Sequence, residues 1–217
     1  MRLVLARHAE CLGNVDKSAY TRIPDHALPL TPHGERQARA AGPRLRGLLG
    51  DGPFGVVVSP YRRTLHSLAL FDLDPAWTRQ EPRLREQDWG NLQDDAGQRT
   101  QEAERNAYGH FFYRLAHGES GADVDDRIAA FLSELSTHPP GVDALLLVTH
   151  GLTMRLLARR ALSWSVALFE SLSNPATCED RVLARGPAGW TLDRPFAQWR
   201  AAEDGTEQEP VSAHSGG

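Results

Sequence analysis

Residues Leu3-Val4-Leu5-Ala6-Arg7-His8 form a short apolar run that ends in an arginine and a histidine. A second apolar run, Leu145-Leu146-Leu147-Val148-Thr149, is followed by His150 and Gly151. Buried strands of parallel sheets have such continuous apolar sequences, and open α/β sheets bind ligands at the carboxyl ends of their strands. If both runs are strands of one parallel sheet, both histidines emerge at that edge. Arg7 then indicates that the ligand is an anion.

Strand and helix patterns alternate along the rest of the chain. Val56-Val57-Val58 predicts another buried strand, and Thr31-Pro32 predicts a helix start, because threonine caps helices and proline fits the first helical position. Apolar residues at helical spacing predict helices over 38–49, 65–71, 124–135 and 154–158. This alternation predicts an α/β fold, namely a three-layer α/β/α sandwich with a mostly parallel sheet.

Two segments have less regular patterns. The polar stretch through Asn14, Asp16 and Asp25 predicts a loop. Residues 77–121 carry mixed charge and several aromatic residues, and we interpret them as a partly helical insertion that covers the sheet edge. Neither segment has the period of a buried strand or of a long helix.

The C-terminal part predicts a hairpin and a tail. Residues 181–184 and 190–192 flank the turn signal Gly186-Pro187, which predicts antiparallel strands at the edge of the sheet. Residues 202–217 are rich in Glu, Gly and Ser and predict a disordered tail. We therefore expect one domain over residues 1–201.

The composition argues against several classes of protein and of partner. The 217 residues carry a net charge of −4, so the field of the whole molecule repels a nucleic acid. No apolar run approaches the ~20 residues that span a membrane, so no membrane association is expected. Cys11 and Cys178 are too few for a disulfide framework, and no secretory signal is evident. We expect a reduced, cytoplasmic protein, and its apolar strands are compatible with a homodimer.

A histidine in a phosphate site can attack phosphorus and hold the phosphoryl group through an N–P bond. The attack requires a neutral ring nitrogen, with cations around the phosphoryl oxygens. Arg7 and the pair Arg62-Arg63 are candidates for these cations, since Lys17 is the only lysine. The leaving oxygen needs a proton, which Glu86 or Asp88 can donate.

His150 and Gly151 complete the candidate site. The imidazole of His150 can donate a hydrogen bond to the anion from the sheet edge. Gly151, at the start of a helix, allows backbone N–H groups to approach the same oxygens. Each of these residues alone is a weak signal, and it is their convergence at one sheet edge that predicts a site.

At these residues the chain resembles the histidine phosphatase superfamily, which has the phosphoglycerate mutase-like fold. The family's first signature, Arg-His-Gly-Glu followed by Asn, is similar to Arg7-His8-Ala9-Glu10 with Asn14. The second arginine signature is similar to Ser59-Pro60-Tyr61-Arg62-Arg63-Thr64 and favours Arg63 as the phosphate ligand. Three further elements match in chain order: Leu30-Thr31-Pro32-His33-Gly34-Glu35-Arg36-Gln37-Ala38, Leu84-Arg85-Glu86-Gln87-Asp88-Trp89-Gly90 and Val148-Thr149-His150-Gly151.

The resemblance implies a role for each matched residue. It implies that His8 is the nucleophile that becomes phosphohistidine and that Glu86 protonates the leaving alcohol. The implied phosphate pocket consists of Arg7, Asn14, Arg63 and His150. The resemblance implies neither a metal nor a cofactor, and a site with two arginines disfavours a divalent cation. Within the family, the chain is most similar to the phosphoglycerate mutase-like proteins of plants and fungi.

The catalytic pocket does not separate the phosphatases of this family from its mutases. The mutases have a longer, basic insertion that binds a second carboxylate or phosphate, whereas the segment here is short and mixes Arg99, Arg105 and Arg114 with glutamates. We therefore predict a phosphomonoesterase that acts on a small phosphorylated metabolite. One alternative is a 2,3-bisphosphoglycerate-dependent phosphoglycerate mutase. The other is a catalytically weak phosphate-binding protein, which the presence of His8 and Glu86 disfavours.

Overall fold

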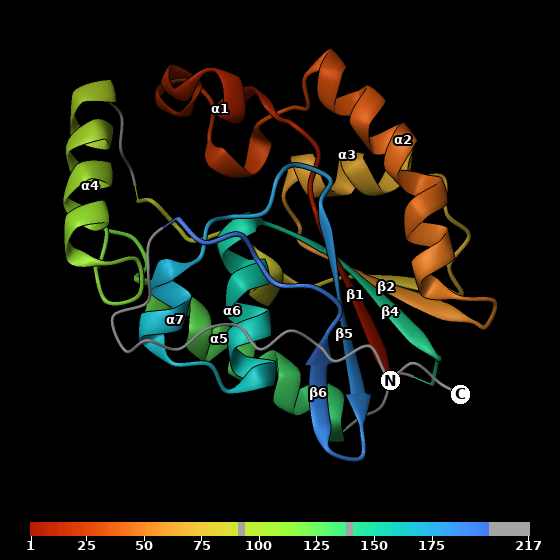
Figure 1. Cartoon of the computed structure of the whole chain (residues 1–217). Helices are drawn as coiled ribbons and strands as arrows, with labels where there is room; N and C mark the ends of the chain where they lie inside the picture. The colour runs from red at the N-terminus through yellow and green to blue at the C-terminus, as the bar shows by residue number, and fades with distance from the viewer. Residues whose placement is uncertain (91–93, 138–140, 200–217) are drawn as a thin grey trace.

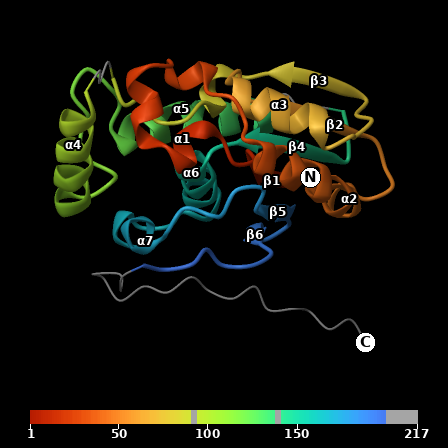
Figure 2. The same ribbon diagram turned by 90° about the horizontal axis from the view of Figure 1, so that it is seen from above.

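Six strands form a single sheet in the computed structural model, which describes residues 1–90, 94–137 and 141–199. They lie in the order β3-β2-β4-β1-β5-β6 (Figures 1 and 2). The strands are β1 (Arg2–Arg7), β2 (Phe54–Val58), β3 (Trp77–Gln80), β4 (Ala144–Thr149), β5 (Asp180–Gly186) and β6 (Gly189–Leu192). The first four of the order are parallel neighbours, whereas β5 pairs antiparallel with β1 and β6. The predicted mostly parallel sheet and the antiparallel hairpin are confirmed.

Helices cover both faces of this sheet (Figures 1 and 2). α2 (Pro32–Leu49) and α3 (Arg62–Leu70) pack on one face, and α5 (Gly121–Thr137) and α6 (Gly151–Leu162) pack on the other. The shorter or outlying helices are α1 (Leu12–Val15), η1 (Lys17–Thr21), η2 (Asp25–Ala27), η3 (Pro82–Leu84), α4 (Asp95–Tyr108) and α7 (Val166–Ser171), where η denotes a 3-10 helix. The layers are those of the predicted α/β/α sandwich.

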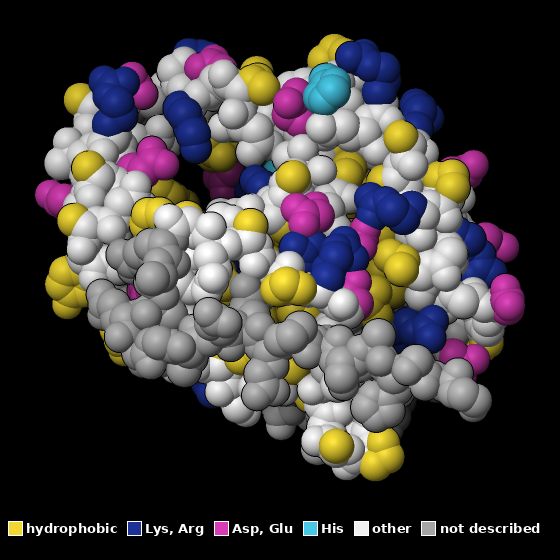
Figure 3. Space-filling view, in the orientation of Figure 1, with side chains coloured by type: hydrophobic (Ala, Val, Ile, Leu, Met, Phe, Trp, Pro, Cys, Tyr) yellow, Lys and Arg dark blue, Asp and Glu magenta, His cyan; other side chains and the backbone are white. Residues whose placement is uncertain are grey.

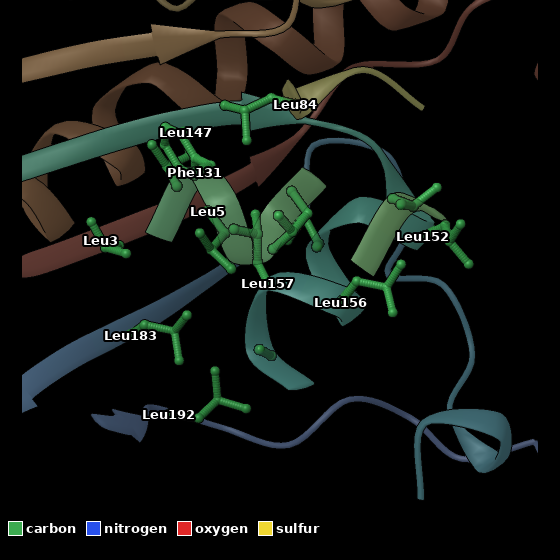
Figure 4. Close-up of a cluster of buried hydrophobic side chains, with 14 of the residues drawn as sticks. Leu3, Leu5, Leu84, Phe131, Leu147, Leu152, Leu156, Leu157, Leu183 and Leu192 are labelled. Atoms are coloured by element: carbon green, nitrogen blue, oxygen red, sulfur yellow. The ribbon is translucent and has the colours of Figure 1, made fainter. Parts of the chain in front are cut away.

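Alternate side chains of the strands enter two separate cores. On β1, Leu3 and Leu5 belong to the core beneath α5 and α6, which Figure 4 shows. Val4 and Ala6 belong to the core beneath α2 and α3. Successive side chains of a strand point to opposite faces, so an uninterrupted apolar run requires that both faces are covered. The apolar runs therefore place their carboxyl ends, and the histidines after them, at the edge of a sheet whose central strands are buried on both faces.

Helix α2 begins at the predicted residues. The Thr31 side chain accepts a hydrogen bond from the Gly34 N–H at 2.9 Å, and Pro32 occupies the first helical position. Gly34 packs directly on the segment after β1, because a Cβ at this position would lie 2.0 Å from the Glu10 carbonyl oxygen. This contact fixes the start of α2 against the segment that carries His8.

We expect Gly34→Ala to lower the free energy of unfolding by about 1–3 kcal/mol, because the added methyl group overlaps the backbone of Glu10. Gly47→Ala is a matched control in the same helix, since, apart from its own stretch of helix, no atom of the described residues lies within 4 Å of its added Cβ. The better helix propensity of alanine should make this control more stable by up to about 1 kcal/mol. Urea unfolding measures both changes, and equal stabilities would show that the contact of Gly34 does not constrain the helix.

Parts of the secondary structure differ from the prediction. Residues 77–80 form strand β3 at the sheet edge, although they were expected in a partly helical insertion. The polar stretch after β1 contains α1, η1 and η2 in place of the expected loop, and α7 was not expected. These helices have six residues or fewer, which is too short for a helical period to show in the sequence.

Two further expectations concern the chain as a whole. The predicted tail, residues 202–217, lies outside the described residues. Across the described ranges, no helix is long and apolar enough to cross a membrane.

Candidate active site

The parallel register of β1 and β4 places the two strand-end histidines side by side. Arg7 pairs with Thr149, so His8 and His150 are the next residues on neighbouring strands. The His8 N–H donates to the Thr149 carbonyl oxygen at 3.0 Å, and the two ring centroids lie 5.2 Å apart. Both residues are buried, with 3% and 0% exposure. The structure thus brings both histidines to the carboxyl edge of the sheet, as the apolar runs indicate.

The surroundings of His8 favour the neutral form of its ring, which has one nitrogen available. Its Nδ1 lies 2.7 Å from the Ala9 carbonyl oxygen, which only accepts, so this assigns the proton to Nδ1 and leaves the lone pair on Nε2. Burial lowers the pKa of His8 well below its ordinary value, and the charges of Arg63 and Arg7 lower it further. A neutral imidazole with a free nitrogen is the form that attacks phosphorus.

His150 has one engaged and one free ring nitrogen. Its Nε2 lies 2.8 Å from Ser59 Oγ, which follows the end of β2. Its Nδ1 is buried, and within the described part of the chain no atom forms a hydrogen bond with it. Burial and the charge of Arg63 hold the pKa of His150 well below its ordinary value. When the Ser59 hydroxyl donates to Nε2, Nδ1 carries the proton and can donate to an oxygen in the site.

Two buried guanidinium groups lie at the same edge. Arg7 ends β1 and donates to the Pro175 carbonyl oxygen. Arg63, in the first turn of α3, forms an ion pair with Asp25 in which Nη1 and Oδ1 are 2.8 Å apart. Burial lowers the pKa of Arg7; burial also acts against the charge of Arg63, but Asp25 outweighs it and raises the pKa of Arg63. Arg62 is exposed, so Arg63 is the arginine of the pair that reaches the site.

Hydrogen bonds fasten the segment that carries Glu86 to the helices beside it. Thr153 Oγ1 of α6 donates to the Arg85 carbonyl oxygen at 2.9 Å, and Arg127 Nη2 of α5 donates to the Glu86 carbonyl oxygen at 3.1 Å. The Glu86 side chain lines the same cavity as His8. Asp88 is exposed and lines a neighbouring cavity instead. Of the two carboxyl groups proposed from the sequence, Glu86 is the one near the nucleophile.

These groups line a cavity of about 170 Å³. Figure 3 shows the surface hollowed between α4 and the segment around α1, which lies near the top of the view. The lining residues are Arg7, His8, Asn14, Lys17, Tyr20, Asp25, Arg63, Glu86, Gln87, Trp89, Gln98, Glu102, Arg105, Leu152 and Asn174. Five of the seven predicted site residues are among them, and His150 and Gly151 are not. Among the described residues, no group of three or more His, Cys, Asp or Glu side chains is arranged to hold a metal ion.

Asn14 and Gly151 are both held by close neighbours. Asn14 Oδ1 accepts the Cys11 N–H at 2.9 Å, which orients the amide of Asn14 in the cavity wall. Gly151 begins α6 and packs against Asn174, whose Cγ would lie 2.8 Å from a Cβ added at Gly151. Asn174 lines the cavity, whereas Gly151 does not. The polar side chain that lines the cavity beside the start of α6 is therefore that of Asn174, which the sequence patterns do not reveal.

Arg105 of α4 is a second cavity residue whose place cannot be derived from the sequence motifs. It is 8% exposed, and its Nη2 donates to Gln87 Oε1 at 3.0 Å. Its guanidinium carbon lies 5.4 Å from the centroid of the Trp89 ring. No carboxylate in the described ranges forms an ion pair with it. Helix α4 thus brings to the cavity a buried guanidinium that forms no ion pair with a described residue.

A family model described as "Histidine phosphatase superfamily (branch 1)" matches residues 3–198. This chain therefore belongs to the histidine phosphatase superfamily. The match covers nearly all of the described residues, so the resemblance seen in five short motifs extends over the whole sandwich.

Similar proteins include a plant protein, a fungal enzyme and a solved bacterial structure. The phosphoglycerate mutase-like protein AT74H of Arabidopsis thaliana is 38% identical over 211 residues, which are 87% of this chain and 75% of that protein. The broad-range acid phosphatase DET1 of Saccharomyces cerevisiae is 42% identical over 100 residues, 43% of this chain and 30% of that enzyme. A mycobacterial glucosyl-3-phosphoglycerate phosphatase in complex with VO3 is 27% identical with a TM-score of 0.71, over 88% of this chain and 96% of that one.

Proposed function

We propose that this protein hydrolyses a phosphomonoester of a small metabolite through a phosphohistidine on His8. The observation that carries the proposal is the free Nε2 of a neutral His8 in a cavity shared with Arg7, Arg63 and Glu86. A nucleophile, two cations and a carboxyl group are what phosphoryl transfer through a covalent intermediate requires. The phosphatases among the similar proteins support the same reaction class.

In the first step, Nε2 of His8 attacks phosphorus, and the bond between phosphorus and the leaving oxygen breaks. Protonated Glu86 transfers its proton to that oxygen, so the product leaves as a neutral alcohol. Arg7, Arg63 and the Nδ1–H of His150 bind the other phosphoryl oxygens and stabilise their charge. The step leaves a phosphohistidine and an ionised Glu86.

In the second step, a water molecule attacks the phosphohistidine. The Glu86 carboxylate accepts a proton from this water, the N–P bond breaks, and its electron pair returns to Nε2 of His8. Inorganic phosphate is released, and Glu86 is again protonated for the next cycle. One carboxyl group thus serves as acid and then as base.

The unpaired charge of Arg105 favours a second candidate, a phosphoglycerate mutase. A buried guanidinium without a carboxylate partner suits a second anionic group on the substrate, such as the carboxylate of a phosphoglycerate. However, helix α4, which carries Arg105, also places Glu102 in the cavity wall. The carboxylate of Glu102 opposes the binding of a second anion. Hydrolysis therefore remains the first proposal.

Phosphate release from a panel of phosphomonoesters tests the proposal. We expect the purified protein to release inorganic phosphate from p-nitrophenyl phosphate and from at least one sugar or glycerate phosphate. The same preparation, given 2-phosphoglycerate and a bisphosphoglycerate primer, measures mutase activity. Interconversion of the phosphoglycerates without phosphate release would favour the mutase, and vanadate binding without any turnover would favour a binding protein.

A further inference from the structure

Asp25 places a carboxylate in the cavity that is proposed to bind phosphate. It lines this cavity of about 170 Å³ together with Arg63, and it also lines a neighbouring cavity of about 460 Å³. A negative charge at this place repels an incoming phosphate and weakens its binding. Asp25 therefore weakens the binding of the substrate, and its place in the cavity requires another explanation.

The contacts of Asp25 occupy one edge of the Arg63 guanidinium. Nη1 of Arg63 donates to the Asp25 carbonyl oxygen at 2.7 Å and to Oδ1 at 2.8 Å, and Nη2 lies 3.4 Å from Oδ2. Arg63 Nε is buried and forms no hydrogen bond with any described residue. A guanidinium is a planar fork whose Nη1–Nη2 edge and Nε–Nη2 edge can each bind an oxyanion through two N–H groups. Asp25 takes the first edge and leaves the second edge for another oxyanion.

The Arg63 guanidinium is also held from its face. Its central carbon lies 4.9 Å from the centroid of the Tyr61 ring, and the residue is 3% exposed. The segment that carries Asp25 is also restricted, because Pro24 precedes Asp25 and has a fixed φ of −54°. The Tyr61 ring, together with the carboxylate and the carbonyl oxygen of Asp25, holds the guanidinium of Arg63 in one orientation.

Arg7 and Arg63, the two arginines proposed to bind phosphate, differ in how far nearby carboxylates compensate their charge. Across the described ranges, no carboxylate forms an ion pair with Arg7, whereas Asp25 neutralises much of the charge of Arg63. Burial accordingly lowers the pKa of Arg7, while the pKa of Arg63 is raised because Asp25 outweighs burial. Two uncompensated arginines would bind the product, inorganic phosphate, as strongly as they bind the substrate.

We propose that Asp25 is a positioning residue that directs the Nε–Nη2 edge of Arg63 to the phosphoryl group and whose charge weakens the binding of the product phosphate. This inference rests on the proposed phosphatase function, because it assigns Arg63 to the phosphate. The side chain of Asp25 thus has two effects. Its oxygen atoms hold Arg63, and its negative charge lowers the affinity of the cavity for anions.

Calorimetric titration with inorganic phosphate separates the two contributions without any turnover. Asp25→Asn keeps an oxygen acceptor for Arg63 and removes the charge, so we expect phosphate to bind at least about fivefold more tightly than to the wild type. Asp25→Ala also removes the acceptor, so we expect it to bind phosphate at least about fivefold more weakly than Asp25→Asn. The inhibition constant of phosphate against p-nitrophenyl phosphate should follow the same order.

Asp16→Asn is the matched control, because Asp16 forms an ion pair with Arg22 on the exposed side of the same segment and does not line the cavity. Its phosphate affinity should stay within about twofold of the wild type, since exposed charges are largely screened. A gain in affinity by Asp25→Asn cannot result from misfolding, so the expected result does not depend on full stability of the variant.

Equal or weaker phosphate binding by Asp25→Asn would overturn the role of the charge. Equal affinities of the Asn and Ala variants at position 25 would overturn the role of the oxygen in holding Arg63. If the wild type bound no phosphate at all, the proposed function would fail together with this inference. Normal binding by the wild type with no difference among the variants would overturn the role of Asp25 alone.

Discussion

His8→Ala is expected to lower the turnover of phosphomonoesters by at least about 10⁴-fold, because the variant lacks the nitrogen that attacks phosphorus. Arg7 and Arg63 are unchanged in this variant, so it should still bind inorganic phosphate. Burial and the charges of Arg63 and Arg7 keep His8 neutral, and no proton has to be removed from Nε2 before the attack. A water molecule in the space left by the ring would have no comparable activation.

Steady-state kinetics and phosphoenzyme trapping measure this effect. Brief reaction with a 32P-labelled substrate should label the wild type through an acid-labile N–P bond and should leave His8→Ala unlabelled. His66→Ala is the control, because it removes an imidazole from α3 that does not line the cavity. Turnover by His8→Ala within about tenfold of the wild type would contradict nucleophilic catalysis by this residue.

The residues at the ends of buried strands are the part of the site that the sequence predicts best. Arg7, His8 and His150 each adjoin an apolar run, and parallel pairing necessarily brings the ends of β1 and β4 to one edge. Arg63 follows in the first turn of the helix after β2. For these residues, it is sufficient to predict where the strand ends, because the residues that follow lie at the sheet edge.

Residues on irregular or distant elements could not be placed from the sequence. Asp25 lies in a 3-10 helix of three residues, and Arg105 lies on α4, so only tertiary packing brings them to the cavity. Strand β3 was missed for a different reason. Its residues Trp77-Thr78-Arg79-Gln80 carry no apolar run, because only Trp77 packs against the core, while the next three residues are exposed on an edge strand that pairs with β2 through its backbone.

Glu86→Gln is expected to slow the hydrolysis of an alkyl phosphate by about 10²–10⁴-fold, because glutamine cannot protonate the leaving alkoxide. With p-nitrophenyl phosphate, the leaving phenolate needs little help from a proton. The burst of nitrophenol that reports phosphorylation of His8 should therefore stay within about tenfold of the wild-type rate. The steady state should still be slow, because the second step uses the same carboxylate as a base.

Glu102→Gln provides the matched control, since it replaces a carboxyl group by an amide in the same cavity wall but on helix α4. If Glu86 acts only through its charge, the two variants should lose similar activity, and the loss should be the same for alkyl and nitrophenyl phosphates. If Glu86 transfers the proton, only Glu86→Gln should show a loss that grows with the basicity of the leaving group. Rapid-mixing kinetics over a series of aryl and alkyl phosphates distinguishes these outcomes, and a loss independent of the leaving group would contradict proton donation by Glu86.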